Sequence, residues 1–154
     1  MAFDPKKWTL KTSEAFAAAI DQAKALSNPE LTPDHVLAAL MRQDDTIVPA
    51  VLAKLGLAPL MVRNKADEAV GKLPKAYGGQ DPRMNRELDN VVQNAQQYQN
   101  DLKDDFLSVE HLLLAMNARL GIGSEELLQA LKEVRGSHRV TSQNPEENFA
   151  ALEK

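Results

Sequence analysis

The amino-acid sequence predicts an all-α domain made of two related helical halves. Apolar residues recur at helical spacing along nearly the whole chain, and Val, Ile and Thr never alternate as they do in strands. One segment, 30–40 (ELTPDHVLAAL), returns as 106–116 (FLSVEHLLLAM) at an offset of 76 residues. A chain of 154 residues buries roughly 68–70% of the surface that its unfolded form exposes, so two half-size lobes are able to share one core.

The repeated segment keeps a loop, a polar cap, an acid, a histidine and an apolar helix face in the same order. Self-similarity at a fixed offset indicates a repeated structural unit. The matched pairs are Leu31 with Leu107, Thr32 with Ser108, Asp34 with Glu110, His35 with His111, Leu37 with Leu113 and Ala39 with Ala115. Both halves are therefore expected to contain the same capped helix.

A long helix is expected to precede each copy. One face of the first carries Ala15, Phe16, Ala19, Ile20, Ala23 and Leu26, and the corresponding face of the second carries Val91, Val92, Ala95, Tyr98 and Leu102. Thr9 is expected to cap the first helix. Asn28–Pro29 ends this helix, because proline disfavours helical backbone in the residue before it.

Capping residues locate the shorter helices. Thr32 is a natural N-cap, with Pro33 at the first helical position and Asp34 in the positive first turn. Ser108 and Glu110 repeat the cap and the acid. Further helices are expected near 48–55 with Gly56 as the C-cap, from Pro59 to about 71–73, and from Ser124, followed by Glu125 and Glu126, to about Val134.

Two segments are predicted to be non-helical. Residues 74–82 (PKAYGGQDP) are rich in turn formers and connect the two halves. Residues 135–145 (RGSHRVTSQNP) are polar and lack periodicity, so they are expected to form an exposed, mobile tail. Phe149 and Leu152 suggest the start of an amphipathic helix, as if the chain were cut before another domain.

Composition and charge favour a soluble cytoplasmic protein that binds neither nucleic acid nor membrane. The formal net charge is -4 and the basic residues are scattered, whereas phosphate binding needs a basic face. The absence of cysteine excludes disulfides and thiolate metal sites. No apolar run approaches the roughly 20 residues that cross a bilayer, and the N-terminus lacks the apolar stretch of a signal peptide.

The sequence contains no recognisable catalytic or metal-binding motif. The acid–histidine pairs Asp34–His35 and Glu110–His111 are adjacent, so their side chains point about 100° apart and chelate one metal poorly. The favoured interpretation is structural: the acid stabilises the helix dipole and the histidine packs near the cap. The Walker pattern is absent, since Gly71–Lys72 is followed by Leu73. We therefore expect no enzymatic activity, no cofactor and no metal in this chain.

Acidic residues gather before the second capped helix, at Asp101, Asp104, Asp105 and Glu110. One interpretation is an ordinary solvated helix end. The alternative is an acidic rim beside apolar side chains such as Val92 and Phe106, which would suit peptides that carry both apolar and basic residues.

The doubled pattern resembles the N-terminal domain of the Clp ATPase chaperones, and four segments are similar to the ClpB disaggregase branch. These are 72–78 (KLPKAYG), 104–113 (DDFLSVEHLL), 134–142 (VRGSHRVTS) and 148–154 (NFAALEK). The last two resemble the linker that leads into the first ATPase module. The resemblance implies a domain of about eight helices, with two pseudo-symmetric four-helix repeats at about 9–73 and 84–134. The domain would cover 1–136, and 137–154 would be a linker towards a first ATPase module.

The resemblance also implies a substrate site. Family residues tied to substrate binding correspond to Thr9, Asp104 and Glu110, and all three residue types match. The neighbouring apolar groove keeps Val92, whereas Asn94 and His111 stand where some relatives carry leucine, so we expect a more polar groove and weaker binding. With Phe106, the predicted substrate-binding residues are Thr9, Val92, Asp104, Phe106, Glu110 and His111.

The implied function is the weak binding of misfolded or aggregated polypeptides and their delivery to a hexameric ATPase ring that uses ATP and magnesium. A DnaK-type chaperone system would cooperate with the full-length homohexamer, and this chain alone would be monomeric. An alternative in the same fold is an N-domain of a Clp protease chaperone that docks a folded adaptor, although the linker motif disfavours it. A small hydrolase using Glu110 and His111 is a third hypothesis, which the missing motifs disfavour.

Overall fold

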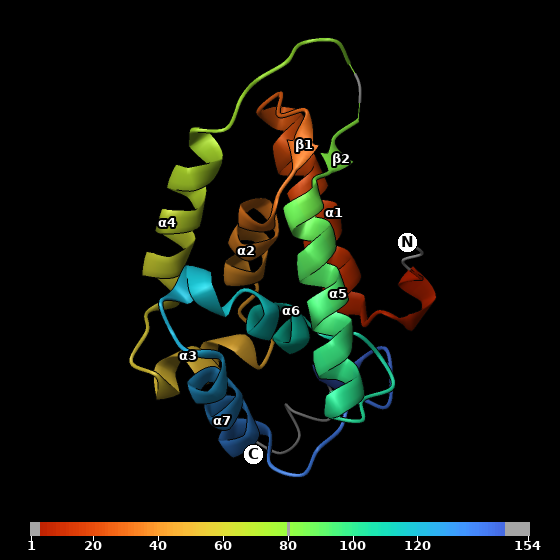
Figure 1. The fold of residues 1–154 in the computed structure, drawn as a ribbon, viewed down its shortest axis with the longest axis vertical. Coiled ribbons are helices and arrows are strands. Elements are labelled where there is room, and N and C mark those ends of the chain that lie inside the picture. Colours follow the sequence, from red (N-terminus) through yellow and green to blue (C-terminus); the bar gives the residue numbers. More distant parts are fainter. Residues whose placement is uncertain (1–3, 80, 147–154) are drawn as a thin grey trace.

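The computed structural model describes residues 4–79 and 81–146, and within them the fold is mostly helical (Figure 1). In chain order, the α-helices are α1 (Leu10–Ala25), α2 (Pro33–Arg42), α3 (Val48–Lys54), α4 (Pro59–Gly71), α5 (Arg86–Asp101), α6 (Val109–Ala115) and α7 (Ser124–Arg135). The short elements are the 3-10 helices η1 (Pro5–Lys7) and η2 (Asn117–Leu120) and the strands β1 (Glu30–Leu31) and β2 (Arg83–Met84).

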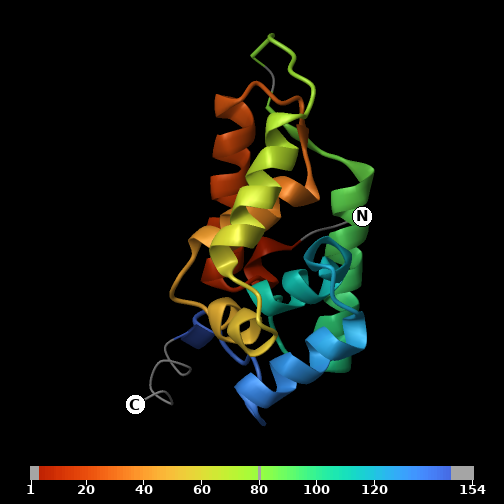
Figure 2. The same cartoon turned by 90° about the vertical axis from the view of Figure 1, so that its left-hand side faces the viewer.

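The helices pack around one hydrophobic core. Helix α2 is buried between α1 and α4, and α6 packs against both α5 and α7. Helices α3 and α7 lie together at one end of the molecule, and the loop between α4 and β2 projects from the other end (Figures 1 and 2). The largest fully buried side chains include Leu40, Leu52, Leu88 and Leu113, which come from both halves. The predicted apolar faces therefore form a single shared core.

Local structure recurs at the 76-residue offset found in the sequence. Thr9 caps α1 and Asn85 caps α5, and each side chain accepts a hydrogen bond from the backbone N–H three residues later. After each long helix, one non-glycine residue adopts a left-handed conformation, namely Ser27 at φ 58° and Lys103 at φ 59°. The two long helices thus start and end in the same way, and Thr9 is confirmed as an N-cap.

Short parallel backbone pairings connect the two halves. Leu31 of β1 pairs with Met84 of β2, and Leu107 forms an isolated parallel bridge with Trp8. The two pairings involve equivalent residues, because Leu107 corresponds to Leu31 and Met84 to Trp8 at the same 76-residue offset. Only the half that supplies each partner is exchanged. Each half therefore binds the segment that precedes the long helix of the other. The sequence does not predict these strands, since a strand of two residues is too short to produce a periodic pattern of apolar residues.

The two repeated histidines close the N-termini of α2 and α6, which confirms the structural interpretation. His35 Nδ1 accepts a hydrogen bond from the Thr32 backbone N–H at 2.9 Å, and His111 Nδ1 accepts one from the Ser108 N–H at 2.8 Å. A ring nitrogen that accepts a backbone proton carries none of its own, so each ring has its proton on Nε2. Burial lowers the pKa of His35, against a smaller opposing effect of the Asp34 charge.

The halves differ at the third element, between the capped helix and the last helix of each half. Gly56 and Gly121 both adopt positive φ, at 73° and 70°, but they are 65 residues apart because the second half is shorter here. The second half therefore has only the 3-10 turn η2 where the first has α3. The expected total of about eight helices becomes seven α-helices among the described residues.

The predicted exposed tail is wrong at two residues, Arg135, which ends α7 and is buried, and Val140. The side chain of Val140 is 3% exposed, and its backbone N–H and C=O both form hydrogen bonds with the domain. Residues 136–139 are exposed as expected. The suggested amphipathic start at Phe149 and Leu152 lies outside the described residues.

Candidate functional site

The six predicted site residues are mostly buried. Thr9, Val92 and His111 have no exposed surface, Asp104 and Glu110 are each 6% exposed, and Phe106 is half-buried. The structure brings Asp104, Glu110 and His111 together at the start of α6. Thr9 contacts the loop before α6, whereas Val92 lies in the hydrophobic core on α5.

Asp104 is the centre of a buried polar cluster. His111 Nε2 donates to its Oδ2 at 2.6 Å, and Arg135 Nη1 donates to the same oxygen at 2.9 Å. Arg135 Nη2 donates to Oδ1, which also accepts the backbone N–H of Val140 at 2.9 Å. The carboxylate therefore holds together α6, the end of α7 and the segment that follows α7.

Glu110 and Ser108 complete the cluster. The Ser108 hydroxyl donates to Glu110 Oε1, and Glu110 Oε2 lies 3.5 Å from Arg135 Nη1. Arg135 Nε donates to the carbonyl of His138 at 2.8 Å. Arg135 was expected in the exposed tail, and its role in the cluster was not predicted. Nothing in the local sequence marks it as the partner of a carboxylate 31 residues earlier.

Burial and hydrogen bonding act on Asp104 in opposite directions. Burial alone would raise the pKa of its carboxyl group, but the donors on His111, Arg135 and Val140 outweigh it, and the pKa lies below its ordinary value. The cluster is thus built around an ionised carboxylate.

Both the backbone N–H and the side-chain hydroxyl of Thr9 form hydrogen bonds within the domain. Its backbone N–H donates to the carbonyl of Leu107 at 2.9 Å, and its Oγ1 accepts the Thr12 backbone N–H at 3.2 Å. The Thr12 hydroxyl donates to the same Leu107 carbonyl at 2.9 Å. Thr9 therefore joins the start of α1 to the loop before α6.

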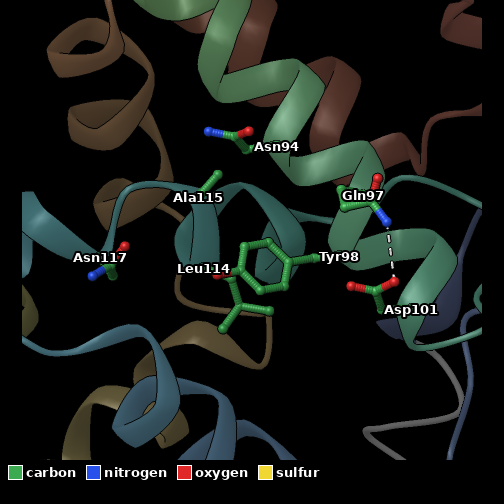
Figure 3. A pocket seen from close by; sticks show the side chains of 7 residues that line it. All are labelled: Asn94, Gln97, Tyr98, Asp101, Leu114, Ala115 and Asn117. Carbon is green, nitrogen blue, oxygen red and sulfur yellow. Dashed lines mark hydrogen bonds between the residues drawn. The ribbon is translucent and has the colours of Figure 1, made fainter.

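An accessible hollow of about 290 Å³ lies beside this cluster, between α5 and α6 (Figure 3). Its lining is mixed, with Tyr98, Leu114 and Ala115 supplying apolar atoms and Asn94, Gln97, Asn117 and Asp101 supplying polar ones. The Tyr98 ring extends towards Leu114, and Gln97 Nε2 donates to Asp101 at 3.1 Å.

The hollow corresponds in part to the predicted groove. Asn94 lines it, as expected for a more polar groove. None of the six predicted substrate-binding residues lines it: Val92 is fully buried, for example, and the His111 ring is turned inward to Asp104. Of the four acids expected at a rim, Asp101 and Asp105 are exposed and the other two are buried. The described residues hold no group of three or more His, Asp or Glu side chains suited to a metal ion, and none of their helices is long and apolar enough to cross a membrane.

The cluster makes a testable contribution to stability. Replacing Asp104 by Asn should lower the free energy of unfolding by about 3–5 kcal/mol, because it leaves the Arg135 charge buried without its partner. Urea unfolding measures this loss. In the double variant Asp104→Asn with Arg135→Met, part of the stability should return, since the unpaired charge is gone. Strictly additive losses in the two single variants and the double variant would contradict the assignment.

The comparisons with known proteins agree with the fold. The model of the Clp repeat (R) N-terminal domain matches residues 7–134. The chain is 38% identical to the chaperone protein ClpB of Corynebacterium diphtheriae, over 95% of this chain, and 39% identical to ClpB of Corynebacterium glutamicum, over 99%. It spans only 19% of the length of each of these relatives.

Solved structures show the same architecture. The Hsp104 N-terminal domain from Candida albicans aligns with a TM-score of 0.77 at 19% identity, covering 91% of this chain and 99% of that one. The ClpV N-domain, solved in complex with a VipB peptide, aligns with a TM-score of 0.62 at 20% identity, covering 99% and 96%. The family match covers most of the chain and falls on the repeat described above. The chain belongs to the Clp repeat N-terminal domain family.

Proposed function

We propose that this chain is the substrate-binding N-terminal domain of a ClpB-type protein disaggregase. In this role it binds exposed segments of misfolded or aggregated polypeptides and delivers them to an ATPase ring. The observation that carries the proposal is the accessible hollow between α5 and α6 (Figure 3). The similarity to ClpB proteins over nearly the whole chain supports it, as does the peptide complex of the ClpV N-domain, which has the same fold.

The lining of the hollow suits an extended polypeptide without a fixed sequence. Primary amides both donate and accept hydrogen bonds, so Asn94, Gln97 and Asn117 are able to pair with a peptide backbone whatever its side chains. Tyr98 offers a flat apolar surface for one side chain, and Asp101 at the edge favours a basic one. The hollow is small, so binding should be weak.

The residues that the family resemblance singled out have two roles in this proposal. Phe106, which is half-buried, does not line the hollow and remains a predicted contact. The buried residues Thr9, Val92, Asp104, Glu110 and His111 act by holding α5 and α6 in position around the hollow. Their substitution would thus impair binding through altered geometry.

The remaining roles belong to the full-length protein. Residues 1–136 would be the binding domain and 137–154 the linker towards the first ATPase module. ATP and magnesium would be bound by the ATPase ring, a homohexamer that cooperates with a DnaK-type chaperone system. A folded adaptor as the partner, as in Clp protease chaperones, is an outcome that the following experiment distinguishes.

Substitution of Tyr98 tests the site. An NMR titration with a model unfolded peptide should shift the resonances of Asn94, Tyr98 and Asn117. Tyr98→Ala should weaken binding about tenfold, which corresponds to roughly 1.4 kcal/mol of lost apolar contact. Tyr77→Ala is the matched control, because Tyr77 is 83% exposed on the loop between the halves.

Equal effects of the two tyrosine substitutions, or shifts confined to the loop around Tyr77, would contradict the proposed site. Urea unfolding of both variants separates lost binding from lost stability. If a folded adaptor binds the hollow and unfolded peptides do not, the fold assignment stands but the proposed substrate is wrong.

A further inference from the structure

The segment after α7 returns across the domain as an extended strap, which we define as residues 138–146. It runs from the polar cluster at Asp104 to the first turn of α1. Between these points it contains no helix or strand. It therefore lies over the same end of the molecule at which Thr9, Asp104 and Glu110 meet.

The strap is held through its main chain and one apolar side chain. The Val140 N–H donates to Asp104 Oδ1 at 2.9 Å, and the Val140 carbonyl accepts the Asp105 N–H at 2.8 Å. The Leu10 N–H donates to the carbonyl of Gln143 at 2.7 Å. The Val140 side chain is 3% exposed, whereas the flanking Arg139 and Thr141 are exposed. An extended peptide bound to a protein surface is held in the same way, with main-chain hydrogen bonds and a pocket for one side chain.

The amide side chain of Gln143 adds a second anchor. Its Nε2 donates to the carbonyl of Lys6 at 2.8 Å and lies 3.4 Å from the carbonyl of Trp8. Lys6 and Trp8 lie three residues and one residue before Thr9 in the chain. The strap thus contacts both the segment before α1 and the Asp104 carboxylate.

At the far end of the strap, the side chain of Glu146 has an oxygen without a hydrogen-bond partner among the described residues. This oxygen, Oε1, is buried. Charged groups from three other places face this carboxyl group: Glu110 of α6, Lys11 of α1 and Asp45 of the loop between α2 and α3. A buried carboxyl oxygen without a hydrogen-bond partner favours release of the segment that carries it, although the group keeps one backbone hydrogen bond.

We propose that the strap is an internal pseudosubstrate, which fills a second peptide site formed by Asp104, the Asp105 N–H and the Leu10 N–H. When the strap lifts, an extended peptide with a β-branched apolar residue takes its place. This second site extends the proposed function and depends on it only in the assumption that the partner is an unfolded chain. It is separate from the hollow between α5 and α6, so the two sites can be tested independently.

The first test uses the strap sequence as a probe. A labelled peptide of residues 137–144 (SHRVTSQN) is titrated into the full chain and into the variant Val140→Gly with Gln143→Ala. A short tether holds its segment at an effective concentration of roughly millimolar, so the attached strap excludes a free peptide. The double variant should therefore bind the peptide at least about tenfold more tightly than the unmodified chain.

Three controls make this result specific. Thr141→Ala, at an exposed strap position, should behave like the unmodified chain. A peptide with Val140→Asp should not bind the double variant. Tyr98→Ala added to the double variant should leave binding unchanged, whereas a loss would place the peptide in the hollow. Equal affinity for the unmodified chain and the double variant would overturn the pseudosubstrate proposal and leave the proposed function intact.

The second test uses pH. Burial, together with the charges of Glu110 and Asp45, raises the pKa of Glu146 to about 7, against the opposing effects of Lys11 and of a backbone hydrogen bond. A raised pKa in the docked state means that docking is strongest below pH 4.5, weakens as the pH rises and has lost this contribution above about pH 7. Hydrogen exchange of the Val140 and Leu10 amides measures docking.

Glu146→Gln removes the titrating group and should increase the protection of these two amides at pH 8 by about tenfold. At pH 4, where the carboxyl group is largely protonated in both the docked and the released strap, the variant and the unmodified chain should be equally protected, which controls for a change in packing. The same protection in both proteins at pH 8 would contradict a role for Glu146 in releasing the strap.

Discussion

The ionised carboxylate of Asp104 is the interaction on which this end of the domain depends. A buried charge is costly unless donors surround it, and Asp104 receives hydrogen bonds from His111, from two guanidinium nitrogens of Arg135 and from the Val140 backbone. These donors belong to α6, to α7 and to the strap. Asp104 therefore links α6, which forms one wall of the hollow, to α7 and to the strap.

In the first half, the position equivalent to Asp104 is occupied by an uncharged residue, Asn28. Asn28 stands 76 residues before Asp104, and its Oδ1 lies 2.9 Å from His35 Nε2. Its amide Nδ2 donates to the carbonyl of Pro74 at 3.2 Å. An amide suits this site because it has to accept from one partner and donate to another. At Asp104 all the partners are donors, so only a carboxylate satisfies them. The two halves thus share the same capped histidine, and only the second half has a charged residue at this position.

The fold could be predicted from the sequence because its main signals are local. The spacing of apolar residues, the caps at Thr9, Thr32 and Ser108 and the left-handed glycine at position 56 each act within a few residues. The repeat also revealed that His35 and His111 share one structural role. The replacement of the third helix by the 3-10 turn η2 in the second half was not predicted, since the family resemblance implied four helices in each half.

The candidate site was predicted only in part, and the reason lies in long-range contacts. The family resemblance grouped Asp104, Glu110 and His111 as substrate-binding residues, which implies a surface, but the structure buries all three. The partner that buries them is Arg135, 31 residues away, together with a polar segment that was expected to be exposed. Tyr98 was predicted as part of an apolar face, and only the packing of α5 against α6 makes it line the hollow.

The most direct measurement of the central claim is an NMR titration of the Asp104 carboxyl carbon, with the Arg135 side-chain N–H signals followed in the same samples. We predict that the Asp104 carboxyl group stays ionised at pH values below its ordinary pKa of 3.8. The Arg135 protons should lose their protection from exchange only when this carboxyl group is protonated. A carboxyl group that titrates at or above 3.8, with Arg135 protons that exchange freely at neutral pH, would contradict it.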